Sequence, residues 1–165
     1  MNDVDELSME DSEALPAERP PAIVVATGVV ARGGALWLPV AGLLAWFGKK
    51  KAARSGLVAG AVAMPLGHLL SRVVGRRRPP AAGMPARRAT PEHPHSPSFP
   101  SKHAVVAAAF GTAVAMEDRP AGAFVTPLVL LVAYSRLRTR VHWPTDVLGG
   151  LLFGALVAVT VSRRR

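Results

Sequence analysis

The stretch that decides the fold is VLGGLLFGALVAVTVS, residues 147–162. It carries no charged side chain on any face of a helix, and neither does AVVAAAFGTAVAM at 104–116. A helix on the surface of a soluble protein repeats polar residues with a period of about 3.6, and both stretches lack that repeat. Their many small residues are those at which helices pack closely in lipid. The pattern predicts helices that span a membrane.

Outward from this stretch, the chain contains five apolar segments, at 22–47, 55–74, 103–116, 121–135 and 147–162. A membrane span needs about 20 residues. The second segment reaches that length, whereas the last three reach it only by including flanking residues such as Ser101, Arg136 and Pro144. The sequence therefore predicts an all-α fold, a multi-pass transmembrane helical bundle.

The first apolar segment is ambiguous because Arg32-Gly33-Gly34 interrupts it. Residues 35–48 make one short span. Residues 22–31 could extend that span, form a separate half-helix or lie on the membrane surface, and the sequence leaves these alternatives open.

Charge divides the 165 residues into two parts. Residues 1–20 hold seven of the eleven carboxylates and no apolar core of a signal peptide, so we expect a disordered acidic tail. We expect residues 21–165 to form the membrane-embedded domain. Its basic residues cluster between apolar runs, which is typical of membrane proteins and argues against nucleic-acid binding. There is no cysteine, and His93 and His95 lack further ligands, so no metal or cofactor site is expected.

The order of the segments brings three polar stretches to one membrane face. The insert 75–100 cannot span a membrane and must lie outside it, and the segments on either side of it begin and end on that side. RRRP at 76–79, PSKH at 100–103 and SRLRTRVHWPTD at 135–146 should therefore meet on one face.

The residue types on this face suit phosphoryl transfer. Pro144 fits the first position of a helix, so Asp146 lies in the first turn and His142 lies just before it. A carboxylate bonded to one ring nitrogen leaves the other as a nucleophile. Ser101 fits the N-cap of the next helix, whose free N–H groups favour anions. Arg78 and Arg136 add planar groups suited to phosphate, so arginines can stabilise the charge in place of a metal.

These pieces resemble the three motifs of the type 2 phosphatidate phosphatase superfamily. The third motif is matched in full by Ser135, Arg136, His142 and Asp146. The second appears at 100–103 with Lys102 where glycine is usual, and the first ends at Arg78-Pro79 with Ser71 where lysine is usual. The resemblance covers about residues 34–162.

The resemblance implies a role for each matched residue. His142 would be the nucleophile, Asp146 its orienting partner and His103 the acid that protonates the leaving group. Arg78, Arg136, Ser101 and the backbone at residue 102 would bind the phosphate. We further predict that the Lys102 ammonium replaces the cation that Ser71 cannot supply.

The expected function is a membrane lipid phosphatase acting on a polyprenyl diphosphate such as undecaprenyl diphosphate, with no cofactor. The alternatives are a phosphatidate or prenyl-monophosphate phosphatase and, as a different class, a weakly active lipid-binding scaffold. If the arginines of the motifs bind phosphate, Lys49–Lys51, Arg54, Arg119 and Arg163–Arg165 mark the cytoplasmic side, and the site faces outward. The sequence leaves the lipid chain, the head group and the oligomeric state open.

Overall fold

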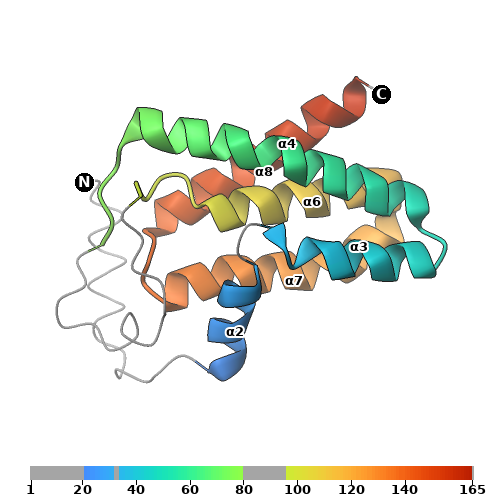
Figure 1. Cartoon of the computed structure of the whole chain (residues 1–165), viewed down its shortest axis with the longest axis horizontal. Helices are drawn as coiled ribbons and strands as arrows, with labels where there is room; N and C mark the ends of the chain where they lie inside the picture. Colours follow the sequence, from blue (N-terminus) through green and yellow to red (C-terminus); the bar gives the residue numbers. More distant parts are fainter. Residues whose placement is uncertain (1–20, 32–33, 80–95, 165) are drawn as a thin grey trace.

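The structure is a computed structural model that describes residues 21–31, 34–79 and 96–164. Within these residues all regular structure is helical, as predicted. The helices are α2 (Ala22–Val30), α3 (Trp37–Trp46), α4 (Lys50–Val74), α6 (Lys102–Glu117), α7 (Arg119–Arg138) and α8 (Pro144–Arg163). The longer helices follow the length of the molecule, whereas α2 lies across that direction beside α7 (Figure 1). The acidic stretch 1–20 and His93 and His95 lie outside the described residues.

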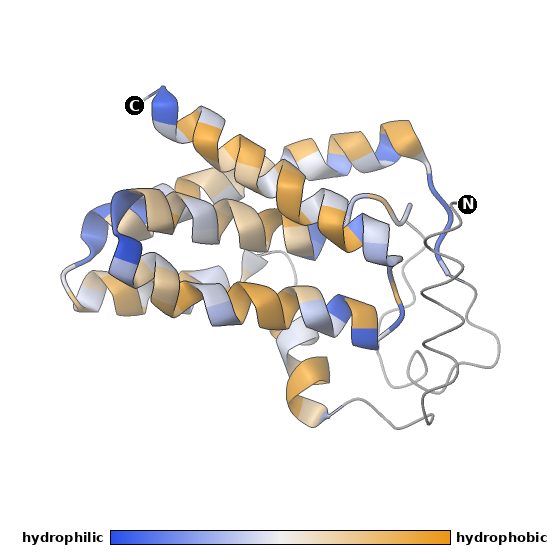
Figure 2. Ribbon diagram, turned by 180° about the vertical axis from the view of Figure 1, so that it is seen from behind, coloured by the Kyte–Doolittle hydropathy of each residue, from blue (hydrophilic) through white to orange (hydrophobic). Residues whose placement is uncertain are grey.

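Three of these helices, α4, α7 and α8, are long and apolar enough to cross a membrane. As predicted, α7 and α8 reach that length by including polar flanking residues, since α7 continues past Arg136 and α8 begins at Pro144. Helix α4 begins at Lys50, several residues before the expected apolar segment. Apolar residues follow the sides of the bundle and hydrophilic residues gather at both ends (Figure 2), as expected for a bundle whose ends reach water.

The ambiguous first segment forms two separate helices. Helix α2 has 9 residues and α3 has 10, and Gly34 between them has a φ of +80°. Glycine adopts such a left-handed conformation without a steric penalty, so the chain can turn sharply between them. Residues 22–31 therefore do not extend the span at 35–48, and α2 is a separate short helix.

Helix α6 lies at the centre of the bundle and contacts α4, α7 and α8. Its contact with α8 is close because Gly150 and Gly154 on α8 form a G-x-x-x-G pair. A Cβ atom at Gly154 would lie 2.1 Å from the carbonyl oxygen of Val105, and one at Gly150 would lie 2.8 Å from that of Ser101. Only glycine allows this approach, which places the start of α6 against the start of α8.

At one end of the bundle, two ion pairs join the α3–α4 turn to the α6–α7 turn. The Lys49 ammonium contacts the Asp118 carboxylate at 2.5 Å, and that of Lys51 contacts Glu117 at 2.8 Å. Asp118 also caps α7 by accepting the backbone N–H of Ala121 at 2.8 Å. The hydrogen bond from Lys49 lowers the pKa of Asp118, and the bond from Ala121 adds to the effect. This end holds the helices together and carries none of the predicted site residues.

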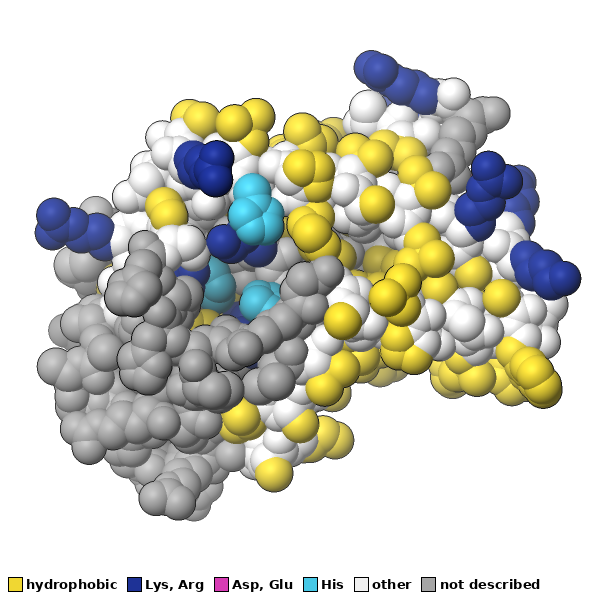
Figure 3. Space-filling view, in the orientation of Figure 1, with side chains coloured by type: hydrophobic (Ala, Val, Ile, Leu, Met, Phe, Trp, Pro, Cys, Tyr) yellow, Lys and Arg dark blue, Asp and Glu magenta, His cyan; other side chains and the backbone are white. Residues whose placement is uncertain are grey.

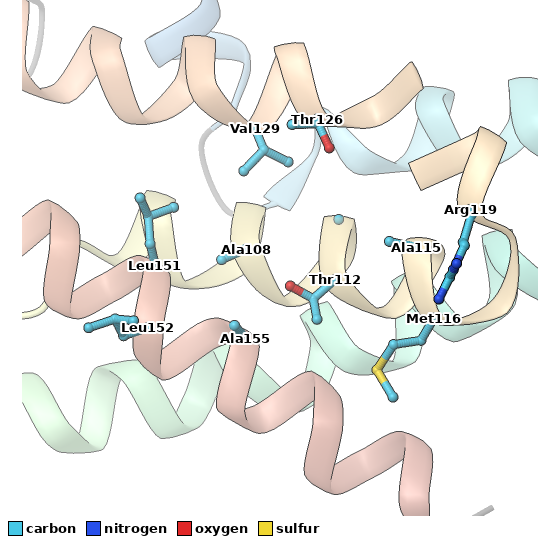
Figure 4. Close-up of a pocket in the computed structure, with 11 residues that line it drawn as sticks. Ala108, Thr112, Ala115, Met116, Arg119, Thr126, Val129, Leu151, Leu152 and Ala155 are labelled. Atoms are coloured by element: carbon cyan, nitrogen blue, oxygen red, sulfur yellow. The ribbon is translucent and has the colours of Figure 1, made fainter. Parts of the chain in front are cut away.

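A groove with a volume of about 640 Å³ opens where α7 and α8 diverge over α6 (Figure 4). Small and apolar side chains line most of it, including Ala108 and Ala155, and Arg119 lies at one end. It contains none of the predicted catalytic residues. Those residues lie at the end of the bundle opposite the Lys49–Asp118 pair.

Candidate active site

The predicted site residues come together at one end of the bundle. Helix α4 ends at a left-handed Gly75, which releases the chain into the Arg76–Arg78 segment. Residues 96–101, the start of α6 and the turn between α7 and α8 meet that segment through the hydrogen bonds described below. Histidine and basic side chains gather at this end of the surface (Figure 3). The convergence that the topology predicted is therefore present.

The start of α8 places Asp146 by a capping box. Pro144 occupies the first turn as predicted, and the carboxylate of Asp146 accepts the backbone N–H of Trp143 at 2.9 Å. The carbonyl oxygen of Asp146 accepts the backbone N–H of Ser101 at 2.9 Å. Asp146 is fully buried. These bonds fix its position relative to both α6 and the turn that carries His142.

The ring of His142 is oriented by a backbone carbonyl. Its Nδ1 lies 2.8 Å from the carbonyl oxygen of Ser98 and 3.7 Å from the carboxylate of Asp146. A carbonyl only accepts hydrogen bonds, so Nδ1 carries the proton and Nε2 keeps its lone pair. The distance to Asp146 is too long for a hydrogen bond. The Ser98 carbonyl is therefore the nearer partner of Nδ1, and the Asp146 carboxylate lies beside the same nitrogen, where it favours the protonated ring.

Arg78 lies beside the free nitrogen of that ring. Its Nη1 donates to the carbonyl oxygen of Val141 at 2.6 Å and lies 3.4 Å from Nε2 of His142. Its Nε donates to the carbonyl oxygen of Ser96 at 2.9 Å. These bonds hold the guanidinium where it can bind an oxygen of a phosphate attached to His142.

Lys102 and Arg78 converge on one hydroxyl group. The ammonium of Lys102 donates to Oγ of Ser96 at 3.2 Å, and Nη2 of Arg78 donates to the same oxygen at 3.3 Å. An anion near Ser96 would therefore meet two positive charges. The position of Lys102 is consistent with its predicted role at the phosphate.

Ser101, His103 and Arg136 complete the predicted set. Ser101 is the N-cap residue of α6 as expected, but its side chain makes no cap bond. Its buried Oγ has no hydrogen-bond partner among the described residues, which leaves it able to bind an anion. His103 lies in the first turn of α6, half-buried. Arg136 is 2% exposed and its Nε donates to Oγ of Ser135 at 3.2 Å.

The sequence reasoning missed two residues that support the site. Arg76 donates to the carboxylate of Asp146 at 3.1 Å and to Oγ1 of Thr145 at 2.6 Å. Ser98 supplies the carbonyl that orients His142, and its own hydroxyl donates to the carbonyl oxygen of Arg77 at 2.9 Å. Arg76 occupies an unspecified position of the first motif, and Ser98 lies outside the motifs. The run of three arginines was a signal, but it could not show which arginine faces Asp146.

The surroundings of His142 favour its neutral form. Burial is the largest cause that lowers its pKa, and the positive charges of Arg78 and Arg136 lower it further, against the opposing effect of Asp146. A neutral imidazole with the proton on Nδ1 is the form that can act as a nucleophile through Nε2.

Residues 52–165 match the PAP2 superfamily, and this range contains every predicted site residue. The chain belongs to the PAP2 superfamily. The family assignment made from the three motifs is therefore confirmed, and with it the class of phosphoric ester hydrolases to which the superfamily belongs.

Two curated relatives of the chain are named for polyprenyl compounds. An undecaprenyl-diphosphatase from Sulfolobus acidocaldarius is 29% identical over 126 residues, which cover 74% of this chain and 60% of that protein. The decaprenylphosphoryl-5-phosphoribose phosphatase of Mycobacterium tuberculosis is 37% identical over 131 residues, 76% of this chain and 70% of that protein. The chain thus spans less than two thirds of the length of the Sulfolobus protein.

The fold also matches a solved membrane phosphatase. The crystal structure of a transmembrane PAP2-type phosphatidylglycerolphosphate phosphatase from Bacillus subtilis superposes with a TM-score of 0.74. The match covers 99% of this chain and 87% of that chain at 22% identity. This likeness confirms the predicted fold class, a multi-pass helical membrane bundle.

Proposed function

We propose that this PAP2 protein hydrolyses a polyprenyl diphosphate through a phosphohistidine intermediate on His142. The observation that carries the proposal is the short contact between Nδ1 of His142 and the carbonyl oxygen of Ser98. The bond from Nδ1 to the carbonyl of Ser98 leaves Nε2 as a lone-pair nucleophile, with the Arg78 guanidinium 3.4 Å away. A buried neutral nucleophile beside fixed cations suits attack on an anionic phosphorus.

The reaction follows from this arrangement in two steps. Nε2 of His142 attacks the terminal phosphorus and forms a P–N bond while the P–O bond to the leaving group breaks. His103 donates a proton to the leaving oxygen. Water then attacks the phosphorus and gives a proton to His103, the P–N bond breaks, and inorganic phosphate leaves. Arg78, Arg136, Lys102 and Ser101 bind the phosphate oxygens throughout.

A polyprenyl lipid is favoured because the two relatives described above are named for undecaprenyl and decaprenyl compounds, and the diphosphate is favoured by the name of the undecaprenyl-diphosphatase. A prenyl monophosphate or phosphatidate is the second candidate, supported by the phosphatidylglycerolphosphate phosphatase fold. A weakly active lipid-binding scaffold is the alternative of another class, suggested by Ser71 and Lys102 in the motifs.

A phosphate-release panel tests the proposal directly. Purified protein is assayed in excess EDTA against farnesyl diphosphate, undecaprenyl diphosphate, undecaprenyl phosphate and phosphatidate, with His142→Ala as the control. We expect the diphosphates to be hydrolysed with the highest kcat/KM, His142→Ala to be inactive and His103→Ala to lose roughly 10²–10⁴-fold. Release from none of the four lipids by the wild type would favour the scaffold, and preference for a monophosphate would change the substrate class.

We also propose that the site faces the outside of the cell. The Lys49–Asp118 end carries basic residues that do not belong to the motifs, and such residues mark cytoplasmic ends. A polyprenyl diphosphate whose head group lies at the outer surface would then reach His142 from that side.

A further inference from the structure

Helix α2 is too short to span the membrane. Its nine residues, at about 1.5 Å each, make roughly 14 Å, against a hydrocarbon core of about 30 Å. It lies across the bundle and packs against α7 (Figure 1). A segment of this length must serve a purpose other than crossing the bilayer.

One face of α2 packs against the rest of the protein. Val24 and Gly28 are buried, and Ala31 directly after the helix is 4% exposed. This spacing of four and three residues is one side of a helix. Ile23 and Val30 lie off this stripe and are 65% and 50% exposed. The stripe, with Gly28 at its centre, is the contact surface.

Gly28 touches the guanidinium of Arg136. A Cβ atom at Gly28 would lie 1.5 Å from Nη2 and 2.7 Å from Cζ of Arg136, so even alanine cannot occupy this position without moving that group. Glycine weakens a helix interior relative to alanine. The close approach of Arg136 explains a glycine within this helix.

Arg136 is thereby enclosed between elements that are far apart in sequence. Its Nε is held by Oγ of Ser135 on α7, and its side chain is 2% exposed. Its charge reaches the ring of His142. A guanidinium that is already held in place can bind phosphate without first being ordered.

We propose that α2 is a wall of the phosphate site and that Gly28 is the positioning residue that lets the Arg136 guanidinium reach the phosphate. This inference rests on the proposed role of Arg136 as a phosphate ligand. It gives a function to a helix that lies outside the residues matched to the superfamily.

Gly28→Ala tests the inference, with Gly42→Ala as its matched control because a Cβ atom at Gly42 meets nothing within 4 Å. Binding of inorganic vanadate to the purified full chain is measured by calorimetry, together with kcat and KM for farnesyl diphosphate. We expect Gly28→Ala to weaken vanadate binding roughly 10- to 100-fold, the loss that follows removal of one charged hydrogen-bonding partner. Gly42→Ala should bind as the wild type does, and neither variant should have a lower Tm than the wild type.

Two further variants separate positioning from loosening of α2. Val24→Ala removes buried surface from the same face of α2 without adding an atom near Arg136, so it should lower Tm and leave vanadate affinity within about twofold of wild type. Arg136→Ala should weaken binding in the wild type but add little in the Gly28→Ala background, because the guanidinium is already displaced.

Wild-type vanadate affinity in Gly28→Ala, additive losses in the double variant, or an equal loss in Val24→Ala would each overturn the positioning role. Failure of the wild type to bind vanadate at all would instead contradict the proposed function.

Discussion

At the scale of single residues, two groups of different kinds hold the imidazole of His142. Ser98 accepts its Nδ1–H at 2.8 Å, while the carboxylate of Asp146 lies 3.7 Å away. The carboxylate oxygens of Asp146 accept hydrogen bonds from the backbone N–H of Trp143 and from the guanidinium of Arg76. Its main structural contribution is to hold the turn that carries His142, and its charge stabilises the ring when phosphate binds.

Because Ser98 accepts the hydrogen bond from Nδ1 of His142, we expect Asp146→Asn to have a limited effect on kcat. In a serine protease triad, where the aspartate itself holds the tautomer, the same change costs roughly 10⁴-fold in kcat. Here the Ser98 carbonyl keeps the proton on Nδ1, so we expect a loss of about 10- to 100-fold from the missing charge. Steady-state kinetics of Asp146→Asn beside His142→Ala measure it. A loss as large as that of His142→Ala would show that Asp146 controls the tautomer.

The lowered pKa of His142 predicts activity in mild acid. Because burial, Arg78 and Arg136 hold the folded-state pKa below its ordinary value of 6.5, the ring stays neutral as the pH falls through that value. The acid limb of kcat/KM should therefore lie below pH 6.5. The pH dependence of kcat/KM for farnesyl diphosphate checks this, with Arg78→Ala as a comparison in which the limb should move up. An acid limb at or above the ordinary value would contradict it.

Lys102 predicts a second kinetic result. Its ammonium and Arg78 meet at Oγ of Ser96, so Lys102→Gly should lower kcat/KM although it restores the residue usual in the family. Adding Ser71→Lys should recover much of the loss, with a coupling of about 0.5–3 kcal/mol if the two cations share the phosphate. Lys50→Gly is the control, since Lys50 is also the first residue of a helix but lies at the opposite end of the bundle. Unchanged or higher kcat/KM in Lys102→Gly would mean that Lys102 has no part in binding.

At the scale of elements, the crossing of α6 and α8 connects packing to catalysis. The glycines of α8 let it approach α6 so closely that the backbone N–H of Ser101 reaches the carbonyl oxygen of Asp146 at 2.9 Å. A shift of one helix along the other would separate the residues of the second and third motifs. The sequence predicted the small residues of this contact, but it did not show that Gly150 and Gly154 face α6.

Gly154→Ala should therefore destabilise the protein. The added Cβ atom would lie 2.1 Å from a backbone oxygen of α6, which cannot rotate away as a side chain can. Overpacking of this kind costs about 1–3 kcal/mol and sometimes more. Thermal unfolding in detergent should show a clear fall in Tm for Gly154→Ala and none for Gly42→Ala. Equal Tm values for the two variants would show that the crossing is looser than the structure has it.

At the scale of the whole molecule, the two ends of the bundle differ in chemistry. One end carries the phosphate site, and the other carries the Lys49–Asp118 and Lys51–Glu117 pairs that join two turns. Apolar sides separate the two ends (Figure 2), so the protein can lie in a membrane with either end facing the outside of the cell.

The proposed orientation predicts opposite labelling of two single cysteines, since the native chain has none. Both positions replace an exposed basic residue: Arg77→Cys at the site end and Lys50→Cys at the other. A membrane-impermeant maleimide should label Arg77→Cys in intact cells and Lys50→Cys only after lysis. The reverse pattern would place the site in the cytoplasm and favour a cytosolic lipid phosphate as substrate.

The sequence by itself determined the helical membrane fold and the common face of the three motifs, because hydropathy sets the spans, alternation of spans sets the sides, and Pro144 and Ser101 mark helix starts. The roles of His142, His103, Asp146, Arg78 and Arg136 are predictions that come from the resemblance of the motifs to the family. Only the tertiary structure decided that Ser98 orients His142, that Arg76 holds Asp146 and that Gly28 lies against Arg136. Each of these is a contact between distant segments through a backbone atom or an unremarkable side chain. Residue type and spacing do not encode such contacts, because they arise only when helices pack at a particular depth and rotation.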